Sequence, residues 1–139
     1  MLAVVWRVSG EPFDVDSFVS EFGFTPDRVW RKGEARRGKP DSHLESGFNL
    51  SIDRDDDDLA HAQYDMRTFL RERKDALSAL RERGIRSTID IGITVGGDRH
   101  YTRSVRLPPE DLAELGRAGI ELMVSAYPGS EDDELKASG

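Results

Sequence analysis

The cleanest alternation of apolar and polar residues in this chain reads Ser87-Thr88-Ile89-Asp90-Ile91-Gly92-Ile93-Thr94-Val95. Successive side chains of a β-strand point to opposite faces of its sheet, so the pattern predicts a strand with one buried and one solvated face. The segment Leu2 to Val8 also alternates, but apolar residues occupy part of its second face. We therefore expect it to be a central strand of the same sheet.

Helical spacing of apolar residues predicts three helices between the strands. The first begins after Asp14, whose carboxylate suits an N-cap, and ends at Gly23. The second and longest runs from near Asp58 to Gly84, and the third opens with Pro109. The other strands are expected at about 27–31, at about 48–52, from a Gly96-Gly97 turn to about Leu107, and at about 120–126.

In chain order these elements read β-α-β-β-α-β-β-α-β. Each helix carries one apolar stripe, so the expected class is α+β, with a mostly antiparallel sheet and all helices packed on one face. The first six elements match the ferredoxin-like order. We expect one domain over residues 1–128 and a disordered acidic tail over 129–139.

Composition excludes several classes of protein. The 139 residues are 37% hydrophobic and 34% charged, with a net charge of −7 and no cysteine. Disulfides and thiolate metal sites are thereby excluded, and the acidic balance argues against nucleic-acid binding. No apolar run approaches the roughly 20 residues of a spanning helix, and the start of the chain lacks signal-peptide features, so we expect a cytoplasmic protein without membrane contact.

A locally basic loop is the main candidate site. Six cations lie between Arg28 and Lys39, against only Asp27 and Glu34. Arginines beside an aromatic ring and a glycine suit a phosphate or carboxylate, which they bind through charge-assisted hydrogen bonds. The alternative to an anion site is a solvated loop whose cations form ion pairs with acidic side chains of the same domain. The candidate ligand-binding residues are Trp30, Arg31, Lys32, Gly33, Glu34, Arg36 and Arg37.

The other polar clusters give no catalytic or metal site. Asp53, Asp55 and Asp57 fall at the first, third and fifth places of an EF-hand loop, but Asp58 replaces its glycine and Tyr64 its glutamate. An acidic helix start explains this run, and we expect no metal or cofactor. The three histidines have no second histidine at a ligand spacing, and no nucleophile or phosphate-binding motif is present.

The sheet face away from the helices is the second candidate surface. It is expected to be polar and chemically mixed, which indicates either a solvated face or a surface for a partner or a second copy. It lacks the aromatic residues with which RNA-binding domains stack bases. The expected residues are Arg7, Asn49, Ser51, Thr88, Asp90, Thr94, Arg103 and Ser125, with Tyr101 and Tyr127 as further candidates.

Several segments together carry a resemblance to a known family: Ser9-Gly10 at the end of the first strand, Trp30-Arg31-Lys32-Gly33-Glu34, Gly47-Phe48-Asn49-Leu50, and Leu107-Pro108-Pro109-Glu110-Asp111-Leu112. Over about residues 2–127 the chain resembles the bacterial domain-of-unknown-function 4279 family. Phe48 stands where the family pattern would have a tryptophan. The resemblance implies a small bacterial α+β domain, in which Trp30, Lys32, Gly33 and Glu34 serve structure or function.

The sequence is compatible with three kinds of function. The first is a non-catalytic interaction module that binds a protein partner or a second copy of the chain. One version of this hypothesis is an immunity-type protein, which binds and neutralises a basic toxin. The second is a small-molecule anion site at Trp30–Lys39, in which Arg31 and Lys32 grip the ligand and Glu34 orients them. The third is an enzyme with dispersed catalytic residues.

Overall fold

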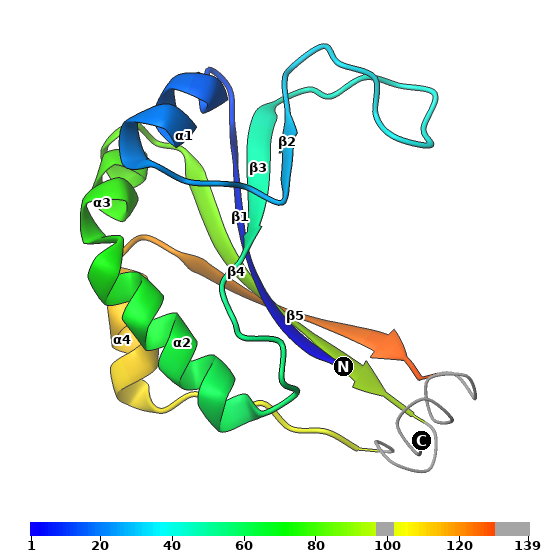
Figure 1. Ribbon diagram of the computed structural model, residues 1–139, viewed down its shortest axis with the longest axis vertical. Helices are drawn as coiled ribbons and strands as arrows, with labels where there is room; N and C mark the ends of the chain where they lie inside the picture. The colour runs from blue at the N-terminus through cyan, green and yellow to red at the C-terminus, as the bar shows by residue number, and fades with distance from the viewer. Residues whose placement is uncertain (97–101, 130–139) are drawn as a thin grey trace.

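One sheet and one layer of helices form the structure, a computed structural model that describes residues 1–96 and 102–129 (Figure 1). The elements in chain order are β1 (Leu2–Gly10), α1 (Val15–Phe22), β2 (Arg28–Trp30), β3 (Ser46–Ser51), α2 (Leu59–Glu72), α3 (Lys74–Glu82), β4 (Arg86–Val95), α4 (Pro109–Arg117) and β5 (Glu121–Pro128).

The strands are arranged in the order β2-β3-β1-β4-β5. The first four strands pair antiparallel, as in a ferredoxin-like sheet, and β5 adds to β4 in parallel through the α4 crossover. The helices lie on one face, so the α+β class predicted from the sequence is confirmed (Figure 1).

The core lies between the helices and the sheet, and Trp6 occupies its centre. Its indole is fully buried and meets the rings of Phe24, Phe48 and Phe69 edge-on at centroid distances of 5.0, 5.1 and 4.9 Å. The indole Nε1–H donates to Ser87 Oγ over 2.8 Å, which satisfies a polar group that burial would otherwise penalise. Phe48, the departure from the family pattern, is therefore a core residue.

Two details differ from the sequence prediction. The long helix is divided at Arg73, which ends α2 and precedes α3; no glycine or proline marks this break in the sequence.

The strand expected before Leu107 is absent from 102–107, while 97–101 lie outside the described residues. This connection instead passes α2, where Arg103 pairs with Asp57 and Gln63 donates to the carbonyl of Arg106. Of the tail expected at 129–139, residues 130–139 also lie outside the described residues.

Candidate functional site

The loop expected after β2 is a two-stranded extension of the β2–β3 hairpin, which projects beyond the sheet (Figure 1). Backbone hydrogen bonds join Gly33 N–H to His43 O (2.9 Å), His43 N–H to Glu34 O (2.8 Å) and Arg36 N–H to Asp41 O (3.1 Å). A bridge pairs Ala35 with Ser42. The extension therefore holds its side chains in a defined position relative to the sheet.

A tight turn at the base of the extension uses four of the predicted site residues. Glu34 N–H donates to Arg31 O over 3.0 Å, and the Glu34 carboxylate accepts from Arg31 N–H at 2.7 Å. Gly33 has a φ of +89°, a conformation that glycine adopts at little cost. Lys32 N–H donates to the buried Ser46 at 2.9 Å. Trp30–Glu34 thus fixes where the extension leaves the sheet.

Trp30 lies against Gly47, its partner in the β2–β3 ladder. A Cβ atom at Gly47 would stand 2.6 Å from Trp30 Cζ2 and 2.3 Å from the carbonyl oxygen of Val8. Any side chain there would displace the indole, so the glycine is required by close approach. Two of the sequence segments that carry the family resemblance are therefore in direct contact.

An open groove of about 470 Å³ lies between the extension and the sheet face away from the helices. Among the described residues its lining contains three arginines, Arg7, Arg28 and Arg36, and one carboxylate, that of Glu45. Its other lining residues are Val8, Ser9, Trp30, Ser42, His43, Leu44 and Asn49.

Strand register brings two of these arginines together. Arg28 on β2 is opposite Asn49 on β3, and Asn49 is opposite Arg7 on β1. Two strand spacings separate the arginine backbones by about 10 Å, so both long side chains can reach a group bound above Asn49. Cations on either side of a neutral amide make this row suited to an anion.

The three guanidinium groups differ in how far they are neutralised. Arg7 Nε donates to the buried Asp90 (3.0 Å), and Arg36 pairs with Asp41 (2.9 Å). Arg28 has no carboxylate partner within the part of the chain that the structure describes; its guanidinium stands 5.6 Å from the centroid of the Trp30 ring. Arg28 is thus the groove cation with most capacity for a ligand.

Aromatic contacts fix the wall of the groove on the β2 side. The Trp30 and His43 rings are nearly parallel, with an interplanar angle of 23° and centroids 5.6 Å apart. The Oδ1 atom of Asn49 is buried and has no hydrogen-bond partner among the described residues. Such an atom is unusual in a folded protein.

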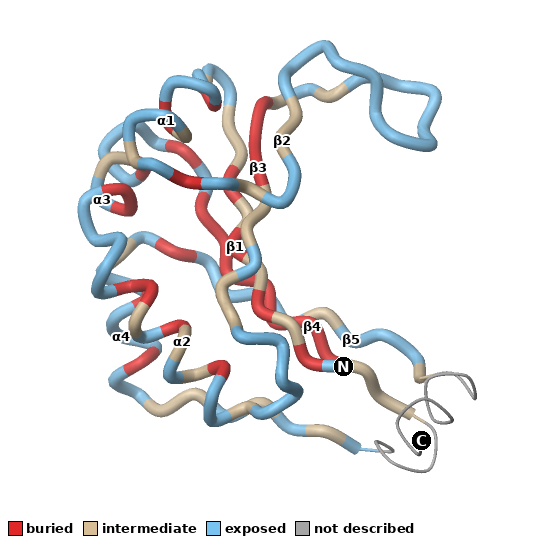
Figure 2. The backbone as a smooth tube through the Cα atoms, in the orientation of Figure 1, coloured by how far each residue is buried: buried red, intermediate tan, exposed pale blue. Residues whose placement is uncertain are grey.

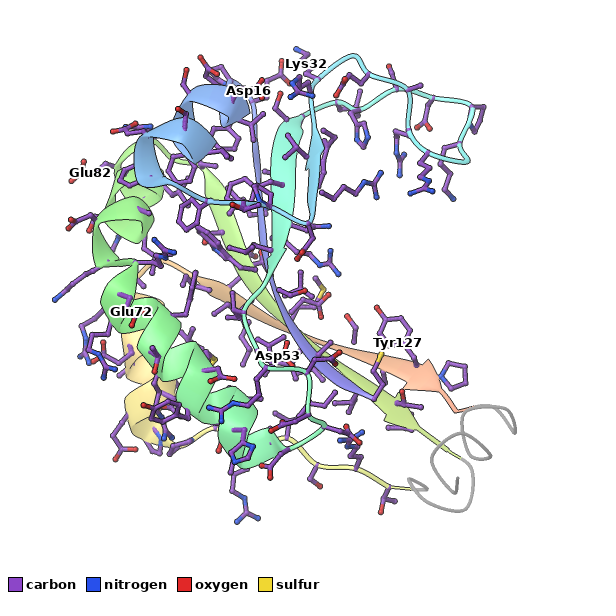
Figure 3. The ribbon with its side chains drawn as sticks, in the orientation of Figure 1. Asp16, Lys32, Asp53, Glu72, Glu82 and Tyr127 are labelled. Atoms are coloured by element: carbon purple, nitrogen blue, oxygen red, sulfur yellow. The ribbon has the colours of Figure 1, made fainter. Side chains whose placement is uncertain are left out.

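The predicted grip residues Arg31 and Lys32 pair with acids in and near α1. Figure 3 shows Lys32 and Asp16 at that end of the molecule. Arg31 forms two hydrogen bonds to Asp16, at 2.7 and 2.8 Å, and this arginine holds the pKa of Asp16 below its usual value. Lys32 pairs with Glu11. Of the seven predicted residues, Trp30 and Arg36 line the groove; Arg37 is exposed at the tip of the extension and is absent from its lining.

The sequence did not identify Arg28, Asn49 and Arg7 as site residues, although it counted Arg28 among the cations of the loop and placed Asn49 and Arg7 on the face away from the helices. His43, one of the three histidines, also lines the groove and is not among the predicted site residues. Alternation in the strands gives the face, but register and the fold of the extension bring these residues together. No signal in a single sequence reports that register.

The acidic run before α2 is occupied by contacts within the domain. Asp53 Oδ1 accepts from Val4 N–H at 3.0 Å, and Asp58 caps α2 by accepting from His61 N–H at 3.1 Å. His61 also pairs with Asp56 and lowers the pKa of that carboxyl. Within 1–96 and 102–129, no three His, Asp or Glu side chains are grouped to hold a metal ion.

Comparison with known proteins gives the family. The model of the family described as Domain of unknown function (DUF4279) matches residues 2–129, so this chain belongs to that family. No curated protein matches the chain. No solved structure matches it either. Within the described residues, no helix is long and apolar enough to cross a membrane.

Proposed function

We propose that this domain is a non-catalytic binding module that takes an anionic group, a carboxylate or a phosphate, in the groove lined by Arg28 and Arg7. The observation that carries the proposal is the row Arg28, Asn49 and Arg7 across three adjacent strands, in which Arg28 has no carboxylate partner among the described residues. Guanidinium groups bind oxyanions through paired, charge-assisted hydrogen bonds.

The groove residues and the predicted site residues take two roles in this proposal. Arg28, Arg7 and Arg36 contact the anion, and Trp30 forms the wall that positions Arg28. Arg31, Lys32, Gly33 and Glu34 position the extension through the turn and its pairs with α1, while Arg37 adds positive charge near the entrance.

An anion can also belong to a protein partner. The interaction-module hypothesis, including its immunity-type version, is compatible with the same groove if an Asp or Glu side chain of the partner enters it.

We place this function in the bacterial cytoplasm, as expected from the sequence. The lack of cysteine and the net charge of −7 are compatible with that location.

The experiment is a calorimetric titration of the full chain with inorganic phosphate and, separately, with acetate, at low ionic strength. Arg28→Gln should weaken binding by roughly 10- to 100-fold, since a hydrogen bond to a charged group contributes about 1.5–3 kcal/mol. Arg71→Gln is the matched control, because it removes the same charge from an exposed arginine of α2 that does not line the groove. Equal losses in both variants, or no binding by the wild type, would refute the proposal.

A further inference from the structure

Strand β5 exposes apolar side chains on both of its faces. Leu122 and Val124 are 37% and 49% exposed on the helix face, and Met123 and Tyr127 are 44% and 46% exposed on the other. On the neighbouring β4, the helix-face residues Ile89, Ile91 and Ile93 are buried. Figure 2 shows this change from buried to exposed between adjacent strands.

The helix layer ends before it covers β5. Helix α4 buries Asp111 and Leu115, while its Leu112 remains 49% exposed. The apolar side chains of β5 therefore lie at the open end of the core, where this chain leaves Leu122 and Val124 in contact with water.

The outer edge of β5 carries no partner strand among the described residues, because β5 is the last strand of the sheet. Soluble proteins protect such edges with lysines, prolines, bulges or a very short strand. β5 is eight residues long and pairs with β4 in unbroken register. Its only charge is Glu121 at the start, which pairs with Arg86, and its proline is the last residue. The opposite edge strand, β2, has three residues.

We propose that the β5 edge binds a second copy of this chain, with the two β5 strands antiparallel about a two-fold axis, to form one continuous sheet. A strand can pair with itself about such an axis, and the same surface then serves both partners. The helices of both copies lie on the same side, and residues directly opposite each other must share a face.

Face matching limits the registers to those that pair odd-numbered with odd-numbered residues and even with even. In the register centred on Val124, this residue meets its own copy and Leu122 meets Ala126. In the register centred on Ser125, Val124 meets Ala126 and Met123 meets Tyr127. Both place apolar side chains opposite each other, and neither places Glu121 opposite another charge. This self-complementarity is why we assign a second copy as the occupant.

The test measures mass by light scattering during size-exclusion chromatography of the full chain over a range of concentrations. The wild type should reach twice the chain mass of 15.6 kDa. Val124→Lys should raise the dimer dissociation constant at least about tenfold, because it puts a charge into the apolar strand pair, opposite its own copy in one register and opposite Ala126 in the other. Tyr64→Lys is the matched control, because Tyr64 is an exposed residue of α2, away from the β5 edge. This variant should dimerise as the wild type does.

A second variant keeps the test informative if Val124→Lys misfolds. The chain has no cysteine, so Val124→Cys creates a single thiol that should form a disulfide-linked dimer under mild oxidation much faster than Tyr64→Cys. A wild type that stays monomeric throughout, or equal cross-linking of both cysteine variants, would overturn the proposal. Monomers whose outward-pointing β5 amides, those not bonded to β4, are protected from hydrogen exchange would show that the edge is already covered within one chain, which would also overturn it.

Discussion

The contact between Trp30 and Gly47 gives the sharpest prediction about the site. Gly47→Ala places a Cβ 2.3 Å from Val8 O and 2.6 Å from Trp30 Cζ2, both far inside normal contact distance. Overpacking typically costs about 1–3 kcal/mol. One obstacle here is a backbone oxygen of the central strand, which cannot rotate away, so we expect about 3 kcal/mol, the upper end of that range.

Urea unfolding followed by circular dichroism measures this cost. For a slope of about 2 kcal/mol per molar urea, the midpoint of Gly47→Ala should fall by about 1.5 M. Gly116→Ala is the matched control, because Gly116 lies in α4 and a methyl group added to it would enter open space. Alanine favours a helix by about 1 kcal/mol over glycine, so this midpoint should rise by about 0.5 M.

The double variant Trp30→Ala, Gly47→Ala separates the two obstacles. Removal of the indole relieves the contact with Cζ2 and leaves the contact with Val8 O, so part of the Gly47→Ala cost should remain. A surface substitution normally changes the free energy of unfolding by no more than about 0.5 kcal/mol. If the free energy of unfolding of Gly47→Ala differs from that of the wild type by no more than this amount, the close approach of Trp30 to Gly47 is wrong.

Two further predictions concern the core and the base of the extension. Ser87→Ala should destabilise the fold by about 1–3 kcal/mol in urea unfolding, because the buried Trp6 N–H loses its acceptor, whereas the exposed Ser20→Ala should change little. The pKa of Asp16 is lowered in the folded state by the Arg31 hydrogen bond, so its contribution is present above the usual value of 3.8 and is lost as pH falls through the folded pKa. Asp16→Asn should therefore flatten the decline in stability below about pH 4; an unchanged acid limb would contradict this.

Local sequence patterns were sufficient for the class of fold. The alternation at Ile89, Ile91 and Ile93 correctly gave a strand with one buried face, and the single apolar stripe of each helix gave a one-sided helix layer. The strand expected from the Gly96-Gly97 turn to about Leu107 is wrong over residues 102–107. Those residues serve a connection beside α2, where Arg103 bonds to Asp57 and to the carbonyl of Met1, and tertiary contacts override the strand pattern.

The candidate site depended on information that local patterns do not contain. The basic composition of the loop was visible, but which cations are neutralised depends on partners distant in sequence, such as Asp16 for Arg31 and Glu11 for Lys32. Arg7 lies on β1 and Arg28 on β2, and α1 separates these strands in the sequence. The strand register nevertheless places both arginines opposite Asn49 on β3. The sequence therefore indicated a basic segment, and the structure indicates the groove beside it.

The most direct test of the anion-binding groove uses the two tryptophans of the chain as internal probes. Trp30 lines the groove, while Trp6 is fully buried and bonded to Ser87, so their indole N–H signals report the site and the core separately. In a ¹⁵N–¹H NMR titration with inorganic phosphate, we expect the Trp30 signal to shift saturably and the Trp6 signal to stay in place, with the Trp30 shift lost in Arg28→Gln. A Trp30 signal that does not move, or that moves equally in Arg28→Gln, would contradict an anion site at Arg28.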